Sequence, residues 1–274
     1  MIELPEARVL AEQINQTLHG KIIAQANANS SPHKFAWYVG DPNDYAIKLK
    51  GKSFQQCQAQ SGMVEMVWDD MTVLFGDGTV LRYYTAEEKH PIKHQLQLLF
   101  TDGSGLYVTI AMYGGIWAFA TGTFENPYYI KASQAIHPLS ESFDRDYFMQ
   151  IDRSQSSLSA KAFLATEQRI PGLGNGCCQD ILWNAGIHPK RKVSSFTETE
   201  FERLYLSVKS ILTEMTHLGG RDTEKDILGK PGGYATKMSK NGMNAPCPKC
   251  GDSIKKEAYM GGSIYYCPTC QPNP

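Results

Sequence analysis

Apolar side chains recur every fourth position near the start of the chain, at Leu10, Ile14 and Leu18. This spacing places them on one face of a helix. Pro5 suits a first helical turn, and Gly20 is typical of the residue that follows a helix. The pattern predicts a helix over residues 6–20.

Short apolar runs replace the helical pattern between residues 45 and 120, among them Met71–Phe75, Val80–Tyr84 and Leu106–Ile110. Turn-forming residues separate these runs, at Asp69-Asp70, Gly76-Asp77-Gly78 and Asp102-Gly103-Ser104-Gly105. Because strand follows strand without a helix-length crossover, the region predicts an antiparallel sheet. A β-sandwich or barrel is favoured over a doubly wound sheet.

Helical periodicity returns in the second half, first over Leu158–Gln168 and next over Cys177–Ala185. A third helix starts where Thr197 and Glu200 match a capping box, and it ends at Gly219-Gly220. An apolar stripe on this helix is typical of a face turned to a core; it consists of Phe201, Leu204, Tyr205, Val208, Ile211, Leu212 and Met215.

Two polar stretches interrupt these patterns. Residues 132–155 indicate a linker, and the Gly-, Lys- and Asp-rich residues Arg221–Asn244 indicate a mobile loop. We therefore expect a multi-domain α+β chain, because 274 residues exceed the usual size of one domain, roughly 100–200 residues. The expected parts are a strand-rich domain, a sandwich or a barrel, with the N-terminal helix (1–131), the linker (132–155), a helical domain (156–240) and a cysteine module (241–274).

Composition places the chain among folded globular proteins, with 42% hydrophobic and 20% charged residues. Collagen, coiled coil and wholesale disorder are excluded. No run approaches the roughly 18 apolar residues that span a bilayer, and the start lacks the basic-then-apolar order of an export signal. We expect a protein that stays inside the cell and does not act at a membrane.

Charge is divided unequally along the chain. Residues 1–150 hold 11 Lys and Arg against 16 Asp and Glu, whereas residues 151–274 hold 16 against 12. A basic second half is compatible with nucleic-acid binding but equally with an ordinary solvated surface.

Two C-x2-C pairs near the end of the chain predict a metal site. Sixteen residues separate the first pair from the second, a spacing that lets four thiolates meet at one tetrahedral zinc ion. Disulfides are disfavoured inside the cell, and redox pairs usually start a helix. We predict one structural zinc per chain, bound by Cys247, Cys250, Cys267 and Cys270. Lysines and tyrosines around it suit a nucleic-acid backbone, although such ribbons also bind proteins. The remaining cysteines, Cys57, Cys177 and Cys178, are expected to be buried small hydrophobic residues.

A glycine turn precedes the helix predicted from Cys177. Gly172 and Gly174 allow a sharp backbone turn, and the helix that follows presents amide groups and the positive end of its dipole. An anion such as a phosphate fits this position. An ordinary helix–helix turn would have the same glycine content.

The order of these motifs resembles the formamidopyrimidine-DNA glycosylase/endonuclease VIII (Fpg/Nei) family. The segments that carry the resemblance are Glu3-Leu4-Pro5-Glu6, Gly51-Lys52, Gly172-Leu173-Gly174-Asn175, Asp180 to Pro189, and Cys267-Pro268-Thr269-Cys270-Gln271. The resemblance implies an N-terminal β-sandwich, a helix-two-turn-helix DNA-binding domain, a C-terminal zinc finger and a cleft between the domains.

The resemblance also implies site residues. In the family an N-terminal amine attacks C1′ of a damaged nucleotide flipped from the duplex and forms a Schiff base. Catalytic roles then fall on Met1, Ile2, Glu3, Glu6 and Lys52, with Glu3 as the acid/base at the sugar. DNA contacts fall on Lys52, Met112, Tyr113, Gly172, Gly174, Asn175 and Tyr234.

This chain departs from the family pattern at three places. Ile2 stands where the nucleophilic proline is expected, so Met1 is expected to remain and its amine to lie about 3.6 Å or less from the family position. Gly262 replaces an arginine of the zinc finger. The residues that fill the void in the DNA do not align, and Met112 or Tyr113 is the candidate wedge in their place.

Three functions therefore compete. The first is a base-excision repair glycosylase with associated abasic-site lyase activity on duplex DNA, in the cytoplasm or nucleoid, working as a monomer. It would use a displaced primary amine or a glycosylase-only route in which Glu3 activates water. The second is a catalytically impaired protein that binds DNA lesions or structures on the same scaffold. The third is an RNA- or protein-binding zinc ribbon, which would leave the glycine turn unused.

Overall fold

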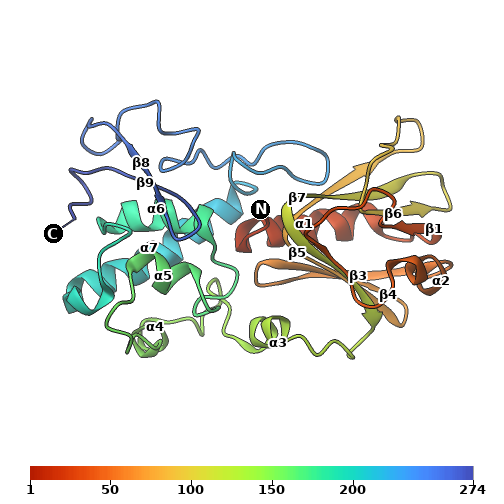
Figure 1. Cartoon of the computed structure of the whole chain (residues 1–274), viewed down its shortest axis with the longest axis horizontal. Coiled ribbons are helices and arrows are strands. Elements are labelled where there is room, and N and C mark those ends of the chain that lie inside the picture. Colours follow the sequence, from red (N-terminus) through yellow and green to blue (C-terminus); the bar gives the residue numbers. More distant parts are fainter. Residues whose placement is uncertain (274) are drawn as a thin grey trace. The chain divides into compact units, whose positions relative to one another are not determined.

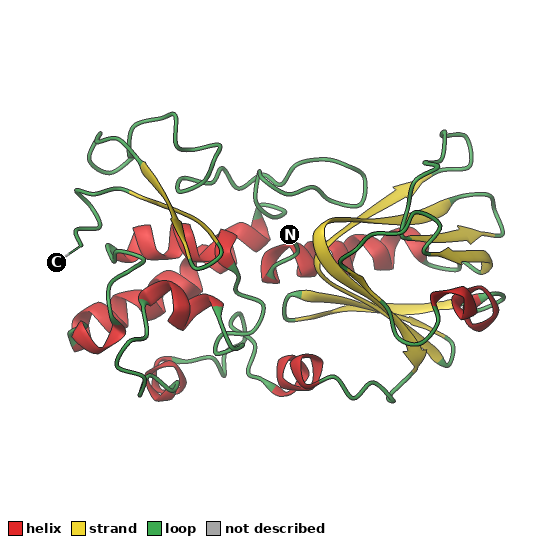
Figure 2. Ribbon diagram, viewed as in Figure 1, coloured by secondary structure: helices red, strands yellow, loops and turns green. Residues whose placement is uncertain are grey.

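The computed structural model describes residues 1–273, which form two compact units (Figures 1 and 2). The first unit comprises Met1–Ile130 together with Glu224–Gly232. The second unit comprises Lys131–Thr223 and the described residues from Gly233 on. None of the helices in the described part of the chain is long and apolar enough to cross a membrane.

One bent sheet forms most of the first unit. Its main path runs β1-β6-β7-β5-β4-β3, and β2 joins β7 in parallel while the other pairs are antiparallel. The strands are β1 (Ile23–Ala28), β2 (Ala36–Trp37), β3 (Phe54–Gln60), β4 (Met63–Trp68), β5 (Met71–Tyr84), β6 (Leu96–Phe100) and β7 (Gly105–Ala120). The unit's helices are α1 (Leu4–Leu18), the short 3-10 turn η1 (Pro42–Asp44) and α2 (Tyr45–Leu49); α3 (Pro127–Gln134) runs out of it into the second unit.

The sheet closes on itself as a sandwich. Trp68 of β4 stacks on Phe100 of β6 with ring centroids 5.8 Å apart, although these strands lie toward opposite ends of the path. The amide of Phe54 donates to the carbonyl of Lys21 at 2.9 Å, which joins the start of β3 to the start of β1. The core between the layers also contains the apolar face of α1, with Ile14 fully buried. The antiparallel β-sandwich with a flanking helix is confirmed.

The turn predicted at Gly76-Asp77-Gly78 is wrong, and its residues lie inside the continuous strand β5. The register against β7 shifts between Asp77 and Thr79, and Asp77 has a φ of 57°. Such a bulge bends a strand without ending it. Both β5 and β7 therefore run through the two layers of the sandwich.

Helices dominate the second unit. They are α4 (Arg145–Gln150), α5 (Ala160–Ala165), α6 (Asn175–Ala185), η2 (Val193–Ser195) and α7 (Glu198–His217), followed by the hairpin of β8 (Lys255–Tyr259) and β9 (Gly262–Tyr266). The capping box of α7 is present, with Thr197 accepting from the amide of Glu200. The predicted stripe is buried except at Tyr205, which confirms that this face of α7 lies in a core.

Two stretches expected to be irregular have defined structure. The expected linker, residues 132–155, contains α4 and the end of α3. The expected mobile loop Arg221–Asn244 is held by buried side chains, since Ile227 is fully buried in the first unit and Tyr234 is buried in the second. Because both stretches are mostly polar, the sequence pattern did not reveal the few apolar side chains that anchor them.

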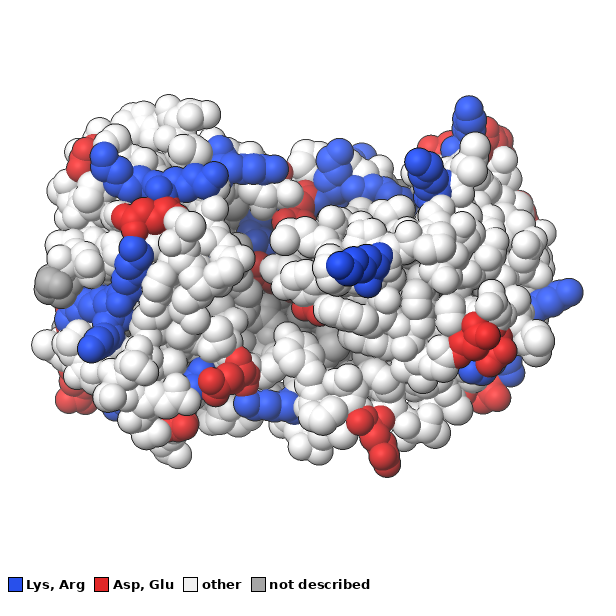
Figure 3. Space-filling model, viewed as in Figure 1, with Lys and Arg blue, Asp and Glu red and all other residues white. Residues whose placement is uncertain are grey.

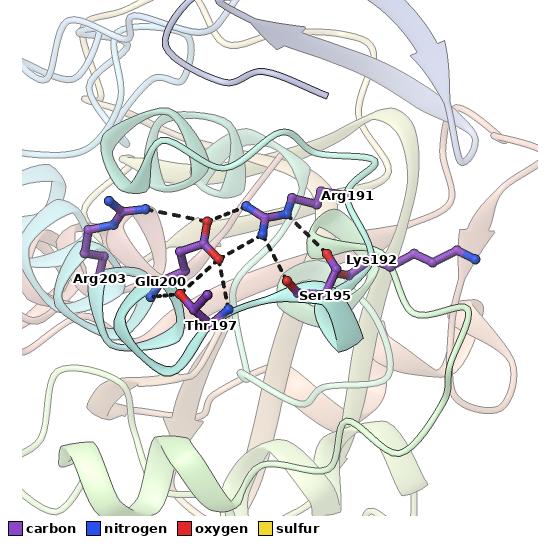
Figure 4. A network of polar contacts seen from close by, with 6 residues as sticks. All are labelled: Arg191, Lys192, Ser195, Thr197, Glu200 and Arg203. Carbon is purple, nitrogen blue, oxygen red and sulfur yellow. Dashed lines mark hydrogen bonds and ion pairs between the residues drawn. The ribbon is translucent and has the colours of Figure 1, made fainter. Parts of the chain in front are cut away.

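A polar network fixes the start of α7 (Figure 4). The guanidinium of Arg191 binds both carboxylate oxygens of Glu200, at 2.5 and 2.8 Å, and also donates to the carbonyl of Ser195 at 3.0 Å. The amide of Thr197 donates to Glu200 at 2.9 Å. The bond from Arg191 lowers the pKa of Glu200 to about 2.

We predict that Glu200→Gln lowers the melting temperature at pH 7 but not near pH 2. A carboxylate whose pKa is lower in the folded state stabilises that state above its ordinary pKa near 4.5, and this contribution is lost as the pH falls toward 2. Thermal unfolding of both proteins from pH 7 to pH 2 measures the difference. Glu214→Gln, an exposed change on the same helix, is the control. A constant difference at every pH would contradict the assignment.

Candidate functional site

The N-terminus is held against the middle of β5. The amide of Ile2 donates to the carbonyl of Asp77 at 2.8 Å, and the Ile2 side chain is buried. Asp77 has a φ of 57° where the register of β5 against β7 shifts, so the irregular backbone turns its carbonyl to this partner. The position where a nucleophilic proline was expected thus carries an amide that is already hydrogen-bonded.

Glu3 and Glu6 both take part in starting α1. Glu3 is the residue before the helix; its side chain accepts from the amide of Glu6, and the Glu6 carboxylate accepts from the amide of Glu3 at 3.2 Å. Both side chains are buried. This reciprocal capping box holds two carboxylates rigidly next to the N-terminus.

The amine of Met1 forms an ion pair with Glu224, and the side chains of the two residues are 35% and 28% exposed. Glu224 lies more than two hundred residues away in sequence but belongs to the same unit. Sequence reasoning missed this residue, because only the fold brings it to the amine.

Tyr113 lies in the field of two carboxylates near the N-terminus. Burial raises the pKa of its hydroxyl, and the negative charges of Asp77 and Glu3 raise it further. Burial also raises the pKa of Asp77. The structure therefore brings together the predicted residues Met1, Ile2, Glu3 and Tyr113, with Asp77 and Glu224 added to them.

Residues 111–113 bulge outward from β7. Ile110 pairs with Thr79 and Gly114 pairs with Asp77, so three residues of β7 face only Gly78. A β-carbon at Gly78 would lie 2.5 Å from the Tyr113 carbonyl oxygen, which explains the glycine. Met112 is 68% exposed as a result.

Trp37 extends this exposed apolar surface. It lies on β2 opposite Gly115 of β7, is 45% exposed, and its ring centroid is 5.7 Å from that of Tyr113. Sequence reasoning missed Trp37, because its segment has no helical or alternating pattern. The structure identifies this surface by an exposed tryptophan beside an exposed tyrosine.

Lys52 is not part of the group around Met1. It forms an ion pair with Asp70, which lies at the turn between β4 and β5. Asp77 is seven residues farther along the chain, in the middle of β5. Lys52 therefore lies by the start of β5, whereas the N-terminus is held at its middle.

The glycine turn of the second unit adopts the predicted bend. Gly172 has a φ of 78°, and Gly174 precedes α6 without a side chain to cap it. The amide group of Asn175 donates to the carbonyl of Ser263 at 3.2 Å and accepts from Gln179 at 3.1 Å. The turn is thus tied to the β8–β9 hairpin.

Lys161 lies at the same place and was not predicted. Its ammonium donates to the carbonyl of Tyr259 at 2.7 Å. A β-carbon at Gly262, where the family arginine is missing, would lie 3.8 Å from this ammonium and 3.6 Å from the Asn175 amide nitrogen. Burial lowers the pKa of Lys161. A lone lysine among the apolar residues of a predicted helix could have indicated it.

Tyr234, predicted to contact DNA, is buried. Its hydroxyl donates to Asp180 at 2.9 Å, and Asp180 also accepts from the amides of Lys237 and Met238. Burial raises the pKa of Asp180. This group of contacts holds the loop after α7 against α6 and leaves the Tyr234 ring away from the surface.

Four cysteines converge as predicted, and their sulfur atoms all lie within 4.8 Å of one another. The Cys247 and Cys270 sulfurs are 3.8 Å apart, and those of Cys250 and Cys267 are 3.4 Å apart. A disulfide would need about 2.05 Å, whereas four thiolates around one zinc lie about 3.8 Å apart, since each Zn–S distance is about 2.3 Å. The set therefore fits a metal ion, with no position left for a substrate. Cys57, Cys177 and Cys178 are buried elsewhere, as predicted.

Basic side chains gather on the second unit. Figure 3 shows a row of Lys and Arg across the part that carries β8. Lys249 lies over the Trp183 ring at 4.5 Å, and Lys256 lies over the Tyr265 ring at 5.8 Å. Exposed cations gathered on one face suit a polyanion.

Comparisons with known proteins match this arrangement. The family model described as "Formamidopyrimidine-DNA glycosylase H2TH domain" matches residues 135–226. A formamidopyrimidine-DNA glycosylase of Lactobacillus delbrueckii subsp. bulgaricus is 28% identical over 282 residues, which cover 99% of each chain. One of Pelotomaculum thermopropionicum is 32% identical over 195 residues, which cover 69% of each chain.

A solved structure has the same fold. The complex of the Lactococcus lactis Fpg with DNA that contains an abasic site superposes with a TM-score of 0.83 at 23% identity. The match covers 99% of this chain and 100% of the other. The β-sandwich, the helices and the terminal cysteine cluster are therefore the parts of one known architecture.

We predict that metal removal detaches the β8–β9 hairpin and leaves the first unit folded. The hairpin buries few apolar residues, so the metal supplies most of its folding free energy. Circular dichroism and limited proteolysis, with and without a chelator, measure the change, and Cys267→Ser should reproduce it. Cys57→Ser, which lies outside the cluster, is the control variant and should not reproduce the effect of the chelator. Protection of the last thirty residues in metal-free protein would contradict the prediction.

Proposed function

The chain belongs to the formamidopyrimidine-DNA glycosylase family, and we propose that it removes damaged bases and processes abasic sites in duplex DNA. The observation that carries the proposal is the similarity to such glycosylases along the whole chain, together with a buried Glu3 fixed beside the N-terminus. Base excision repair in the cytoplasm or nucleoid is the corresponding role.

The nucleophile in this proposal is the α-amine of Met1. The amine attacks through its nitrogen lone pair, which it carries only in the neutral form. Glu3 acts as the acid/base at the sugar ring, and Glu6 holds the helix start that positions it. Because Ile2 cannot supply a secondary amine, the reaction passes through the imine that a primary amine forms.

DNA contacts come from both units. Met112 and Tyr113 are the side chains that enter the duplex, and Trp37 offers a further face for stacking. On the second unit, the Gly172–Asn175 turn holds a phosphate, with Lys161 as the cation near the place of the missing arginine. Lys52 contacts the DNA backbone at another place, and Tyr234 contributes only through its packing inside the second unit.

The cysteine cluster holds one structural zinc ion in this proposal. The ion would keep the hairpin of β8 and β9 folded, and it takes no part in the reaction. The protein acts as a monomer, since neither proposed set of contacts requires a second copy. Its partner is double-stranded DNA with a damaged base or an abasic site.

A second candidate function is a lesion-binding protein without catalysis. The observation that favours it is the Ile2 amide, which donates to Asp77 at the position of the family nucleophile. A displaced amine can cost roughly a hundredfold or more in rate. The scaffold would then still bind lesions but leave them for another enzyme.

Borohydride trapping on abasic-site duplex separates the two functions. We expect a covalent adduct that mass spectrometry locates at Met1, because borohydride reduces an imine to a stable secondary amine. Ile2→Pro should lose Met1 and place a secondary amine at residue 2, so its trapping should be about a hundredfold faster. Ile2→Val, which keeps the β-branched side chain, is the control and should behave as the wild type.

Each outcome assigns a function. An adduct at Met1 supports the glycosylase with lyase activity. Tight lesion binding without an adduct in the wild type, with an adduct in Ile2→Pro, supports the lesion-binding protein. No adduct and no binding by either would contradict both.

We predict that Asn175→Ala weakens binding to abasic-site duplex about tenfold. The change removes the bond to Ser263 and a donor at the phosphate turn. Asn184→Ala, on the same helix, is the control. Fluorescence anisotropy at several salt concentrations measures the DNA affinity of both variants. Equal affinity of the two variants would remove the phosphate assignment.

A further inference from the structure

A segment from late in the sequence completes the first unit. Residues Glu224–Gly232, which we call the strap, leave the second unit and pack with Met1–Ile130. The base of the strap is closed by the amide of Gly232, which donates to the Glu224 carbonyl at 3.2 Å, and by a bridge between Lys225 and Pro231. The backbone of Glu224 is therefore fixed.

Contacts with α1 and β5 anchor the strap. Ile227 is fully buried in the core of the first unit, and its carbonyl accepts from the amide of Tyr83 at 2.8 Å. The Gln13 side chain donates to the Asp226 carboxylate at 3.0 Å and accepts from the Ile227 amide at 3.3 Å. Arg82 donates to the carbonyl of Asp226. These contacts give the strap one position.

The strap delivers one carboxylate to the N-terminus. Glu224 pairs with the Met1 amine, while the amide of the next residue, Ile2, is held by Asp77. The amine is thus fixed on both sides, by a backbone bond behind it and by a carboxylate at its nitrogen. The side chains of Met1 and Glu224 are both partly exposed, so the ion pair lies near the surface of the unit.

We propose that Glu224 positions the Met1 amine and accepts its proton before the amine attacks. The inference rests on the proposed function, because it concerns the nucleophile of that reaction. An ammonium has no lone pair, so a neighbouring base must remove one proton. A primary amine displaced by one residue needs such a partner to occupy a defined place.

The step is balanced with an abasic aldehyde as substrate. Glu224 takes a proton from the Met1 ammonium, and the nitrogen lone pair forms a bond to C1′ while the carbonyl oxygen takes a proton from the nitrogen. The Glu224 carboxyl then protonates the hydroxyl, which leaves as water while the nitrogen forms a protonated imine. The carboxylate is regenerated, and no oxidant or reductant is needed.

Single-turnover trapping of Glu224→Gln on abasic-site duplex tests the inference. We expect a rate constant about a hundredfold lower than that of the wild type, the usual scale for loss of a proton acceptor. The affinity for the same DNA should change less than about threefold, since an amide keeps the shape of the side chain. Glu224→Asp should recover most of the rate, a rescue that a purely structural role would not produce.

Glu12→Gln is the matched control, because Glu12 is an exposed carboxylate on α1 of the same unit. It should trap as the wild type does. Equal rates for Glu224→Gln and the wild type, with the adduct at Met1, would overturn the inference and leave the proposed function standing. An adduct on another residue would also overturn it. No adduct in the wild type would overturn both.

Discussion

The hydrogen bond between the Ile2 amide and the Asp77 carbonyl is the constraint around which the first unit's site is arranged. It depends on the irregular pairing of β5 with β7 at Asp77, since a regular strand would direct that carbonyl into the ladder with β7. The same irregularity places residues 111–113 of β7 outside the ladder and requires Gly78 to have no side chain. One irregularity in the sheet therefore fixes the N-terminus and exposes the apolar side chains next to it.

Features that depend on neighbouring residues could be predicted from the sequence. The capping box at Thr197 and the stripe on α7 are local in this sense, and so is the spacing of the four cysteines. The bulge at Asp77 could not be predicted, because glycine and aspartate favour a turn equally and only the long pairing with β7 decides between the two. Strand order favoured an antiparallel sandwich or barrel, and the family resemblance selected the sandwich.

The candidate site was predicted in part for the same reason. Glu3 and Asn175 belong to short sequence motifs, so their positions could be predicted from those motifs. Glu224 and Trp37 reach their places through contacts that no local pattern encodes. Lys52 follows Gly51 as the family motif requires, yet its ion pair with Asp70 places it by the start of β5.

The strap makes the first unit discontinuous along the polypeptide, and this has a consequence for its biogenesis. The ribosome must synthesise the helices of the second unit, α7 among them, before Ile227 exists to fill its place in the sandwich core. Until then the nascent N-terminal part exposes an apolar gap, and its leading amine has no counter-ion from Glu224. No single cut in the chain can separate the two units intact, so the sandwich matures only as the last quarter of the protein emerges.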